Sequence, residues 1–324
     1  MSSLQTLHDT LRRATNGWQL QSAVTQAFEA AELHYGHGTD CAADEATWLF
    51  AAVHDIEYSA ADWQLQLQCV LDAPPDTATI ARIAELAHTR IATRQPLAYL
   101  LGEAWFAGLK FMVNEQVLVP RSPIGELIGD GFAPWLDGAH IDRVLDIGTG
   151  SGCIAIATAL ALPHAQVHAS DVCANALACA ATNVAYHGLA DRVTLHQSDV
   201  FDGLSGQRFD LIVSNPPYVD ADEMHARPAE YRHEPELGLA AGHDGLSIAR
   251  RLLAQAPAFL NDGGHLILEV GASDEALQRE YAEVPFIWLT FADDAQGVTI
   301  LDKETLIEHH ELFAARMQET PDAG

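Results

Sequence analysis

The sequence predicts an α/β protein in which a doubly wound, mostly parallel sheet follows an N-terminal helical domain. After Pro120, short apolar runs alternate with segments of helical periodicity, and the first run ends in a glycine-rich turn. Before residue 95, the apolar residues recur with helical spacing alone. Strands of a parallel sheet are covered on both faces, so they are expected to be continuous apolar runs. The 324 residues are enough for two domains.

Residues 1–94 are expected to form a small helical bundle. The clearest helix follows Asp76 and Thr77, either of which can cap its first turn. Its apolar side chains recur on one face, at Ile80, Ile83, Leu86, Ala87 and Ile91. This spacing predicts an amphipathic helix that buries one side in the bundle. Pro74-Pro75 separates it from the helix before.

Residues 95–119 are predicted to be a β-hairpin that connects the two domains. The segments PLAYLLG, LKFMV and QVLV are short and rich in residues that favour strands. Gly102, Gly108 and Asn114 divide these segments, and both residue types are common in turns. The change from helical to strand-like spacing places the domain junction in this region.

Residues 120–310 are predicted to contain seven strands of one sheet. In chain order, the strand sequences are RVLDIG, QVHASD, RVTLHQSD, FDLIVSN, GHLILEVG, FIWLTFA and GVTILDK. The helices CIAIATALAL and ANALACAATNVAYHG separate the first three strands, as expected of βαβ units. The turn DDAQ lies between the last two strands, which predicts an antiparallel pair at the sheet edge. Residues 311–324 are expected to be a C-terminal tail without a functional signal.

A glycine-rich turn follows the first strand and opens a helix. The candidate cofactor-binding residues there are Asp146, Gly148, Thr149, Gly150, Ser151 and Gly152. Glycines let the backbone turn sharply and let a ligand approach the main chain closely. Cys153 stands where the third glycine of a dinucleotide-binding pattern would be, so the turn favours a ligand other than a diphosphate.

Two further carboxylates end the next two strands. Asp171 can accept hydrogen bonds from both hydroxyls of a ribose, and Asp199 or its neighbouring amides can meet the edge of a base. Open α/β sheets bind their ligands at the carboxyl ends of their strands. S-adenosylmethionine, which has a ribose and a base but no phosphate, fits this set of residues. Each feature alone is also typical of other nucleotide folds or of a helix cap.

The fourth strand ends in the candidate catalytic residues Asn215, Pro216, Pro217 and Tyr218. Two successive prolines make this backbone rigid. The Asn215 side-chain oxygen and the Pro216 carbonyl can accept both hydrogens of a planar amide or amino group, which localises its lone pair and aims it at a methyl donor. Tyr218 can stack on the flat acceptor and exclude water. The structural alternative is a rigid turn with a buried tyrosine.

The chain resembles the class I S-adenosylmethionine-dependent methyltransferases that modify the side-chain amide of a protein glutamine. The segments that carry the resemblance are QPLAYLLGEAWFAGLKF (95–111), VLDIGTGSGCIAI (144–156), SNPPY (214–218) and EPELGLAAGHDGL (234–246). The resemblance implies a seven-stranded Rossmann-like domain preceded by a substrate-recognition domain, residues 1–94. It also implies cofactor contacts from residues 148–152, Asp171 and Asn215, with Asn215 to Tyr218 holding the glutamine.

Within this family, the segment VLVPRSPIGELI (117–128) resembles the branch that acts on large-subunit ribosomal protein L-three. The branch that acts on peptide-chain release factors usually carries Pro-Arg-Pro-Asp-Thr-Glu at this point, and the stretch Ser122-Pro123-Ile124-Gly125 departs from that form. Methylation of a glutamine in ribosomal protein L-three is therefore the expected activity. Glutamine methylation of release factors is the alternative.

The charge of the chain bears on its partner. Lysine and arginine number 17 against 45 aspartates and glutamates, which gives a net charge of −28. Such a surface repels nucleic-acid phosphates and attracts a basic protein within about one Debye length, roughly 8 Å. We therefore expect a basic ribosomal protein before its assembly with RNA, and neither a stable nucleic-acid complex nor a membrane. A nucleic-acid adenine methyltransferase would need a basic groove, whereas a non-catalytic binding module would keep only the fold.

The remaining signals are expected to be structural. The five cysteines lack a Cys-x-x-Cys pair, and no apolar run suits a signal peptide or a membrane span, which favours a cytoplasmic protein without disulfides. Pro235 follows His233-Glu234, so a mobile polar loop is expected there and no metal site. An ion pair or a helix start explains Arg121 and Glu126 as well as a role in the site would.

Overall fold

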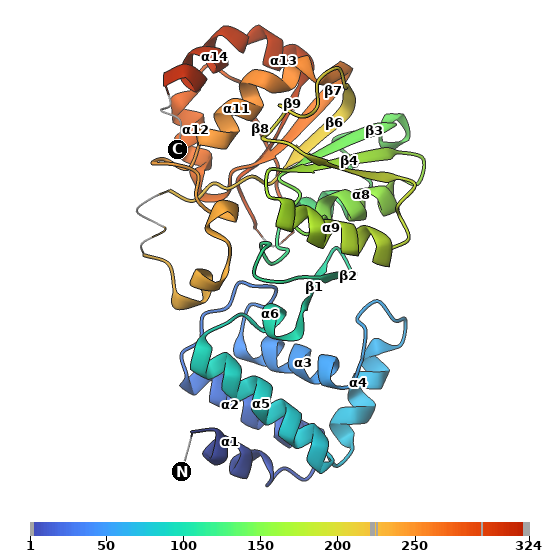
Figure 1. The fold of residues 1–324 in the computed structure, drawn as a ribbon, viewed down its shortest axis with the longest axis vertical. Helices are drawn as coiled ribbons and strands as arrows, with labels where there is room; N and C mark the ends of the chain where they lie inside the picture. The colour runs from blue at the N-terminus through green and yellow to red at the C-terminus, as the bar shows by residue number, and fades with distance from the viewer. Residues whose placement is uncertain (1–2, 221–223, 225, 293, 320–324) are drawn as a thin grey trace. The chain divides into compact units, whose positions relative to one another are not determined.

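The computed structural model describes residues 3–220, 224, 226–292 and 294–319. The chain forms two compact units, whose elements are drawn in Figure 1. The first unit consists of residues 1–115, 119–121 and 228–233, and the second of residues 116–118, 122–227 and 234–324. No helix of the described ranges combines the length and the apolar character that a membrane span requires.

The first unit is built mainly from helices. They are α1 (Ser3–Leu11), α2 (Gly17–Ala30), α3 (Ala42–Val53), α4 (Trp63–Asp72), α5 (Thr77–Thr93) and α6 (Leu97–Leu101). The predicted cap of α5 is confirmed, because the Asp76 side chain accepts a hydrogen bond from the Thr79 N–H at 2.8 Å. The predicted apolar face is confirmed as well, with Ile80, Ile83, Leu86 and Ala87 all buried.

The predicted hairpin is present but shorter than expected. β1 (Glu103–Phe106) and β2 (Leu109–Met112) form an antiparallel pair around Ala107 and Gly108, which both have positive φ angles as a two-residue hairpin loop requires. The segment PLAYLLG is not a strand, because Leu97 and Ala98 are buried in α6, which contacts α3 and α5 and ends at the left-handed Gly102. Residues 116–119, the segment QVLV, lie outside any strand.

The second unit contains the predicted seven-stranded sheet. Its strands are β3 (Arg143–Ile147), β4 (Gln166–Asp171), β5 (Val193–Gln197), β6 (Phe209–Ser214), β7 (Leu260–Glu269), β8 (Ile287–Trp288) and β9 (Val298–Asp302), in the order β5-β4-β3-β6-β7-β9-β8. The first five in this order are parallel, and β9 is antiparallel to both β7 and β8. The expected antiparallel pair at the edge is thereby confirmed. The strands that follow β3 in the chain, β4 and β5, lie on one side of β3, whereas β6 lies on its other side. Open α/β sheets bind ligands at such a change in strand order.

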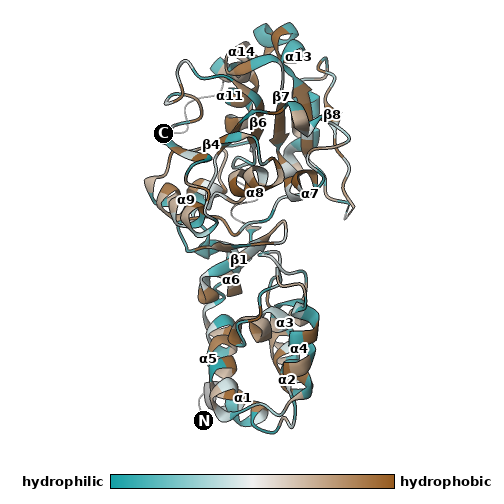
Figure 2. Cartoon of the chain, turned by 90° about the vertical axis from the view of Figure 1, so that its right-hand side faces the viewer, coloured by the Kyte–Doolittle hydropathy of each residue, from teal (hydrophilic) through white to brown (hydrophobic). Residues whose placement is uncertain are grey.

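Helices cover both faces of this sheet (Figure 1). They are α7 (Ile124–Gly129), α8 (Cys153–Ala161), α9 (Ala174–Tyr186), α11 (Ser247–Gln255), α12 (Asp274–Glu280), α13 (Lys303–Glu308) and α14 (His310–Glu319). One core joins the sheet to α11 and α14 and contains Leu145, Ile212, Leu252, Leu253 and Phe313. On the other face, α8 packs against β3 and β4 and is hydrophobic along most of its length (Figure 2). Burial on both faces explains why the strands are continuous apolar runs.

Short 3₁₀ helices complete the chain. They are η1 (Gly138–His140), η2 (Ala229–His233), η3 (Glu236–Gly238), η4 (Ala256–Ala258) and η5 (Gly271–Ser273). The expected C-terminal tail begins within α14, whose Phe313 is fully buried, and residues 320–324 lie outside the described residues.

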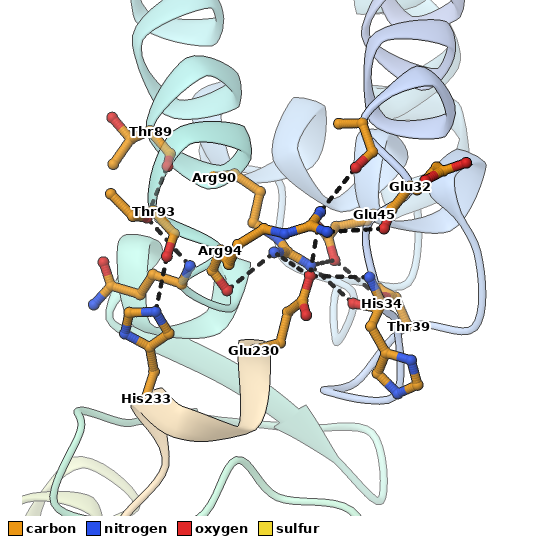
Figure 3. Close-up of polar contacts among 12 residues, drawn as sticks. Glu32, His34, Thr39, Glu45, Thr89, Arg90, Thr93, Arg94, Glu230 and His233 are labelled. Carbon is orange, nitrogen blue, oxygen red and sulfur yellow. Dashed lines mark hydrogen bonds and ion pairs between the residues drawn. The ribbon is translucent and has the colours of Figure 1, made fainter. Parts of the chain in front are cut away.

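A segment from the second half of the sequence, residues 228–233, belongs to the helical unit. Its Glu230 is 1% exposed and lies 3.6 Å from Nη1 of both Arg90 and Arg94 (Figure 3). The His34 N–H donates a hydrogen bond to Glu230 Oε1 at 3.0 Å. Arg90 is equally buried, and its Nε donates to Glu45 Oε1 at 2.7 Å. A network of buried charges thus fixes this segment on α5.

The prediction of a mobile loop at His233-Glu234 is wrong. His233 ends η2, and its Nε2 lies 2.9 Å from the Thr93 carbonyl oxygen (Figure 3). Glu234, the next residue, is 6% exposed. The partner of His233 is 140 positions away in the sequence, so the local pattern of polar residues could not reveal it.

Candidate active site

The glycine-rich turn joins β3 to α8 at the carboxyl edge of the sheet. Gly148, Gly150 and Gly152 have φ angles of +74°, +54° and +83°, which residues with a Cβ rarely adopt. The N–H groups of Gly148 and Thr149 donate to the Ser170 carbonyl in β4, at 2.9 and 3.0 Å. A Cβ added at Gly150 would meet no described atom within 4 Å. The turn therefore leaves room for a ligand to approach the main chain.

Asp146, in β3, is a buried carboxylate with one unused acceptor. Its Oδ2 accepts hydrogen bonds from the Thr149 hydroxyl at 2.6 Å and from the Ala155 N–H at 3.1 Å. Its Oδ1 has no hydrogen-bond partner in the described part of the chain. Burial raises the pKa of Asp146 to about 7, although the two hydrogen bonds act in the opposite direction. A cationic or hydroxyl group of a bound ligand would supply the missing partner.

Asp171, the last residue of β4, connects its strand to the turn. Its Oδ2 accepts the Gly150 N–H at 3.0 Å, and its Oδ1 accepts the Cys173 N–H at 2.9 Å. The side chain is half-buried, and this burial raises the pKa of Asp171 against the effect of the N–H donors. A carboxylate has about four lone-pair positions, so each oxygen keeps room for another donor such as a ribose hydroxyl.

Two other predicted cofactor residues are Ser151, within this turn, and Asp199, after β5. The Ser151 side chain is buried, and its carbonyl accepts a hydrogen bond from Asn183 Nδ2 at 2.9 Å, which fixes the turn on α9. Asp199 follows β5 and is 52% exposed, and Arg251 Nη1 lies 2.7 Å from its Oδ1. A role of Asp199 toward a base stays a prediction, and its carboxylate already has a cationic partner.

The predicted catalytic segment lies directly beside the turn. Ile147 of β3 pairs with Ser214 of β6, and the Ser214 hydroxyl donates to the Ile147 carbonyl at 2.8 Å. A Cβ at Gly148 would be 4.0 Å from the Asn215 carbonyl oxygen. Pro216 is buried, whereas the side chain of Asn215 is half-buried. The structure therefore brings the start of the predicted catalytic segment next to the glycine-rich turn.

Tyr218 is held at both its main chain and its ring. Its carbonyl accepts a hydrogen bond from the Ser273 hydroxyl at 3.1 Å. A Cβ at Gly271 would be 2.4 Å from Cε2 of the Tyr218 ring and 2.7 Å from Cζ, so the ring lies directly on the backbone of Gly271. The next residue, Val219, forms a bridge with Ala240. The end of the predicted catalytic segment is thus fixed on η5 and on the chain after η3.

Glu269 is a residue of this site that sequence reasoning missed. It ends β7, the strand next to β6, and is 3% exposed. Its Oε2 lies 2.5 Å from the Ser122 hydroxyl, and its Oε1 lies 3.4 Å from the Tyr218 hydroxyl. The available signal was a single carboxylate at the end of the apolar run GHLILEVG, on the strand after the catalytic segment.

Arg121 and Glu126, for which the sequence did not decide between a structural role and a role in the site, both have contacts within the fold. The Arg121 guanidinium lies 5.4 Å from the centre of the Tyr231 ring, in the helical unit. Glu126, in α7, accepts a hydrogen bond from the Ala292 N–H at 3.1 Å. Among the described residues, no group of three or more histidine, cysteine or acidic side chains is arranged to hold a metal ion.

Comparison with known proteins places the chain in a family. Residues 132–230 match the family model of the Methyltransferase small domain. The chain is 42% identical over 304 residues to a ribosomal protein uL3 glutamine methyltransferase of Bordetella pertussis. The aligned region covers 94% of this chain and 97% of that protein. It is 38% identical over 323 residues to the protein of that name from Francisella tularensis, with coverage of 98% and 96%. For the protein of that name from Xanthomonas campestris, the identity is 44% over 300 residues, with coverage of 92% and 94%. The chain belongs to the family of ribosomal protein uL3 glutamine methyltransferases.

Proposed function

We propose that this protein transfers a methyl group from S-adenosylmethionine to the side-chain amide nitrogen of a glutamine in ribosomal protein uL3, the large-subunit protein L-three. The observation that carries the proposal is the position of Asn215-Pro216-Pro217-Tyr218 beside the glycine-rich turn, across the pair of strands β3 and β6. A rigid segment with two hydrogen-bond acceptors then adjoins a turn suited to a nucleoside. The shared name of the relatives supports the same activity.

The residues at the carboxyl edge of the sheet fit S-adenosylmethionine. When bound, this cofactor supplies an electrophilic methyl group on a positively charged sulfur. Asp171 offers acceptors to the ribose hydroxyls, and the main chain at Gly150 leaves room beside them. The unused Oδ1 of Asp146 suits a donor on a cationic ligand. Asp199 is our candidate for the base edge, in which role it would share its carboxylate with Arg251.

The acceptor glutamine would lie on the segment from Asn215 to Tyr218. An amide nitrogen is a poor nucleophile because its lone pair is delocalised into the carbonyl group. The Asn215 side-chain oxygen and the Pro216 carbonyl accept the two amide hydrogens, which favours the form with the lone pair on nitrogen and points it in line with the methyl group. Tyr218 covers the flat face of the amide and keeps water out. The new nitrogen–carbon bond would form as the methyl–sulfur bond breaks, with S-adenosylhomocysteine as the leaving group. One amide proton would be lost to solvent after the transfer, so no strong base is needed before the attack.

The charge of the chain favours the free ribosomal protein over the assembled particle. A protein that packs against RNA is basic, so it should be drawn to an enzyme with a net charge of −28. Within a finished subunit, that basic surface is already paired with phosphate. The RNA would also present a second polyanion to the enzyme. We infer that methylation precedes assembly and slows as added salt screens the charges.

A competition assay tests this proposal. Free uL3, mature large ribosomal subunits and release factors are offered at equal concentrations with labelled S-adenosylmethionine, across a series of salt concentrations. We expect free uL3 to be labelled fastest, and most strongly at low salt. Faster labelling of release factors would assign the enzyme to that substrate instead. Equal labelling of finished subunits would contradict the inferred order of events.

A further inference from the structure

Glu269 is a buried carboxylate at the end of the strand next to the predicted catalytic segment. It ends β7, beside β6 and the catalytic segment, and is 3% exposed. A carboxylate removed from water is destabilising unless hydrogen-bond donors replace the water. Two of its contacts, described above, are with hydroxyl groups that come from different parts of the site. These two contacts link the Tyr218 ring to the segment that contains Ser122.

The first partner is the Ser122 hydroxyl, which lies 2.5 Å from Glu269 Oε2. This distance is typical of a strong hydrogen bond from a hydroxyl to an ionised carboxylate. Ser122 Oγ in turn accepts the Ile124 N–H at 3.2 Å, at the start of α7. Ser122 belongs to the Pro-Arg-Ser-Pro segment, so Glu269 holds this segment against the end of β7.

The second partner is the Tyr218 hydroxyl, which lies 3.4 Å from Glu269 Oε1. Hydroxyl-to-oxygen hydrogen bonds usually measure about 2.5–3.0 Å, so this contact is loose. Contacts that act in a reaction are often long without the substrate and shorten when it binds. The Tyr218 ring lies on Gly271, where even a Cβ would be 2.4 Å from the ring. The backbone of Gly271 therefore restricts the Cδ2–Cε2–Cζ side of the ring.

We propose that Glu269 is a positioning residue for methyl transfer: it fixes the hydroxyl end of the Tyr218 ring and links it to Ser122. The proposal rests on the proposed function, because it assigns the ring to the acceptor amide. Gly271 restricts one side of the ring and Glu269 contacts its hydroxyl, so the acceptor amide meets a flat, preorganised group. Loss of Glu269 should misalign the acceptor and leave the cofactor turn, formed by residues 148–152, unchanged.

The test uses the full-length enzyme with the variants Glu269→Gln, Tyr218→Phe and the two combined. We expect each single variant to lower kcat for uL3 methylation about tenfold, with the calorimetric affinity for S-adenosylmethionine unchanged. The double variant should be no slower than the slower single variant, because both changes interrupt the same contact. Glu280→Gln is the matched control, since Glu280 is a largely buried carboxylate of the same unit whose partner is Arg250. It should keep normal kcat.

If the wild-type enzyme methylates uL3, either of two outcomes overturns the proposal. One is normal kcat in Glu269→Gln, and the other is a double variant whose defect equals the product of the single defects. A wild-type enzyme that does not methylate uL3 would instead contradict the proposed function. In that case, NMR of protein labelled in its tyrosine rings still decides the point about Glu269. The Tyr218 signal, assigned by its loss in Tyr218→Phe, should shift or broaden in Glu269→Gln and not in Glu280→Gln, and an unchanged signal refutes the role.

Discussion

Buried carboxylates occur in both units of the molecule, but their partners differ. In the helical unit, Glu45 and Glu230 are 3% and 1% exposed and share the buried Arg90. At the sheet edge, Asp146 is 1% exposed and accepts hydrogen bonds from a hydroxyl and an N–H group. No lysine or arginine forms an ion pair with Asp146 or Asp171 in the described part of the chain.

We expect this difference to separate a structural role in the helical unit from a binding role at the sheet edge. A carboxylate paired with arginine has its charge compensated, so it can hold two parts of the chain together. A carboxylate that has only neutral donors has no compensating cation, so its ionised form is available to a cationic ligand. S-adenosylmethionine carries such a cation on its sulfur. We therefore expect changes in the helical unit to alter stability, and changes at the sheet edge to alter cofactor binding or turnover.

The largest expected effect is that of removing the shared arginine. Arg90→Met should lower the free energy of unfolding by about 3–5 kcal/mol, because it leaves two buried carboxylates without their common cation. Arg82→Met, on the same helix, is the control, since Arg82 is 54% exposed and its pair with Glu85 should contribute less than about 1 kcal/mol. Denaturant unfolding measures both. Equal stability of the two variants would contradict the structural role of the buried charges in the helical unit. Weak cofactor binding by folded Arg90→Met would contradict the separation of the two roles.

The next effect concerns the acceptor side of the site. Asn215→Ala should lower turnover about 10²-fold or more, because it removes one preorganised acceptor at the reacting amide. Its free energy of unfolding should stay near the wild-type value. Asn261→Ala is the control, since the Asn261 side chain donates to Asp210 at the other end of the sheet strands. Single-turnover kinetics measure the effect, and near-normal turnover would show that Asn215 is structural.

A smaller effect is expected on the cofactor side. Asp171→Ala should weaken S-adenosylmethionine binding at least tenfold, which corresponds to losing a charge-assisted hydrogen bond of about 1.5–3 kcal/mol. The exposed Asp262, which pairs with Lys303, is the control, and Asp262→Ala should bind normally. Titration calorimetry compares the two. Unchanged affinity in Asp171→Ala would show that Asp171 does not hold the ribose hydroxyls of the cofactor.

The smallest effect is a pH dependence from Asp146. Burial raises its pKa from 3.8 to about 7, so the folded protein holds this proton more tightly than the unfolded chain does. Its contribution to the free energy of unfolding is therefore largest at low pH and is lost as the pH rises from about 4 to about 7. A cationic cofactor favours the ionised carboxylate, so cofactor affinity should rise up to about tenfold between pH 6 and pH 8. Calorimetry should show a much weaker rise in Asp146→Asn, and an identical rise in both proteins would exclude Asp146 as the cause.

Local signals predicted much of the fold. The cap at Asp76, the strands of the sheet and the position of Asn215 after β6 follow from patterns within a few residues. The helix Leu97–Leu101 was predicted to be a strand, because a short apolar run has too few positions to distinguish the two periods. Its packing against α3 and α5 decides the matter, and packing is not a local property.

The residues that sequence reasoning missed have distant partners. Glu269 is 147 positions from Ser122, and Glu230 is 196 positions from His34. Each is a single carboxylate in its segment, and a single carboxylate most often lies on the surface. Only the fold shows that these two are buried and what they contact. The positions of the glycine-rich turn and of the segment from Asn215 to Tyr218 in the fold could be predicted because each is a contiguous motif at the end of a strand. Their roles in binding and catalysis stay predictions.

The most decisive measurement is tandem mass spectrometry of free uL3 after reaction with S-adenosylmethionine, with wild-type enzyme and with Asn215→Ala in parallel. If the sheet edge binds the cofactor and the segment after β6 holds the glutamine, the wild-type enzyme should add one methyl group to a glutamine side chain of uL3. The Asn215→Ala reaction should leave that glutamine almost unmodified in the same time. A methyl group on another residue type, no modification, or equal modification by both enzymes would contradict the assignment of this edge as a glutamine methyltransferase site.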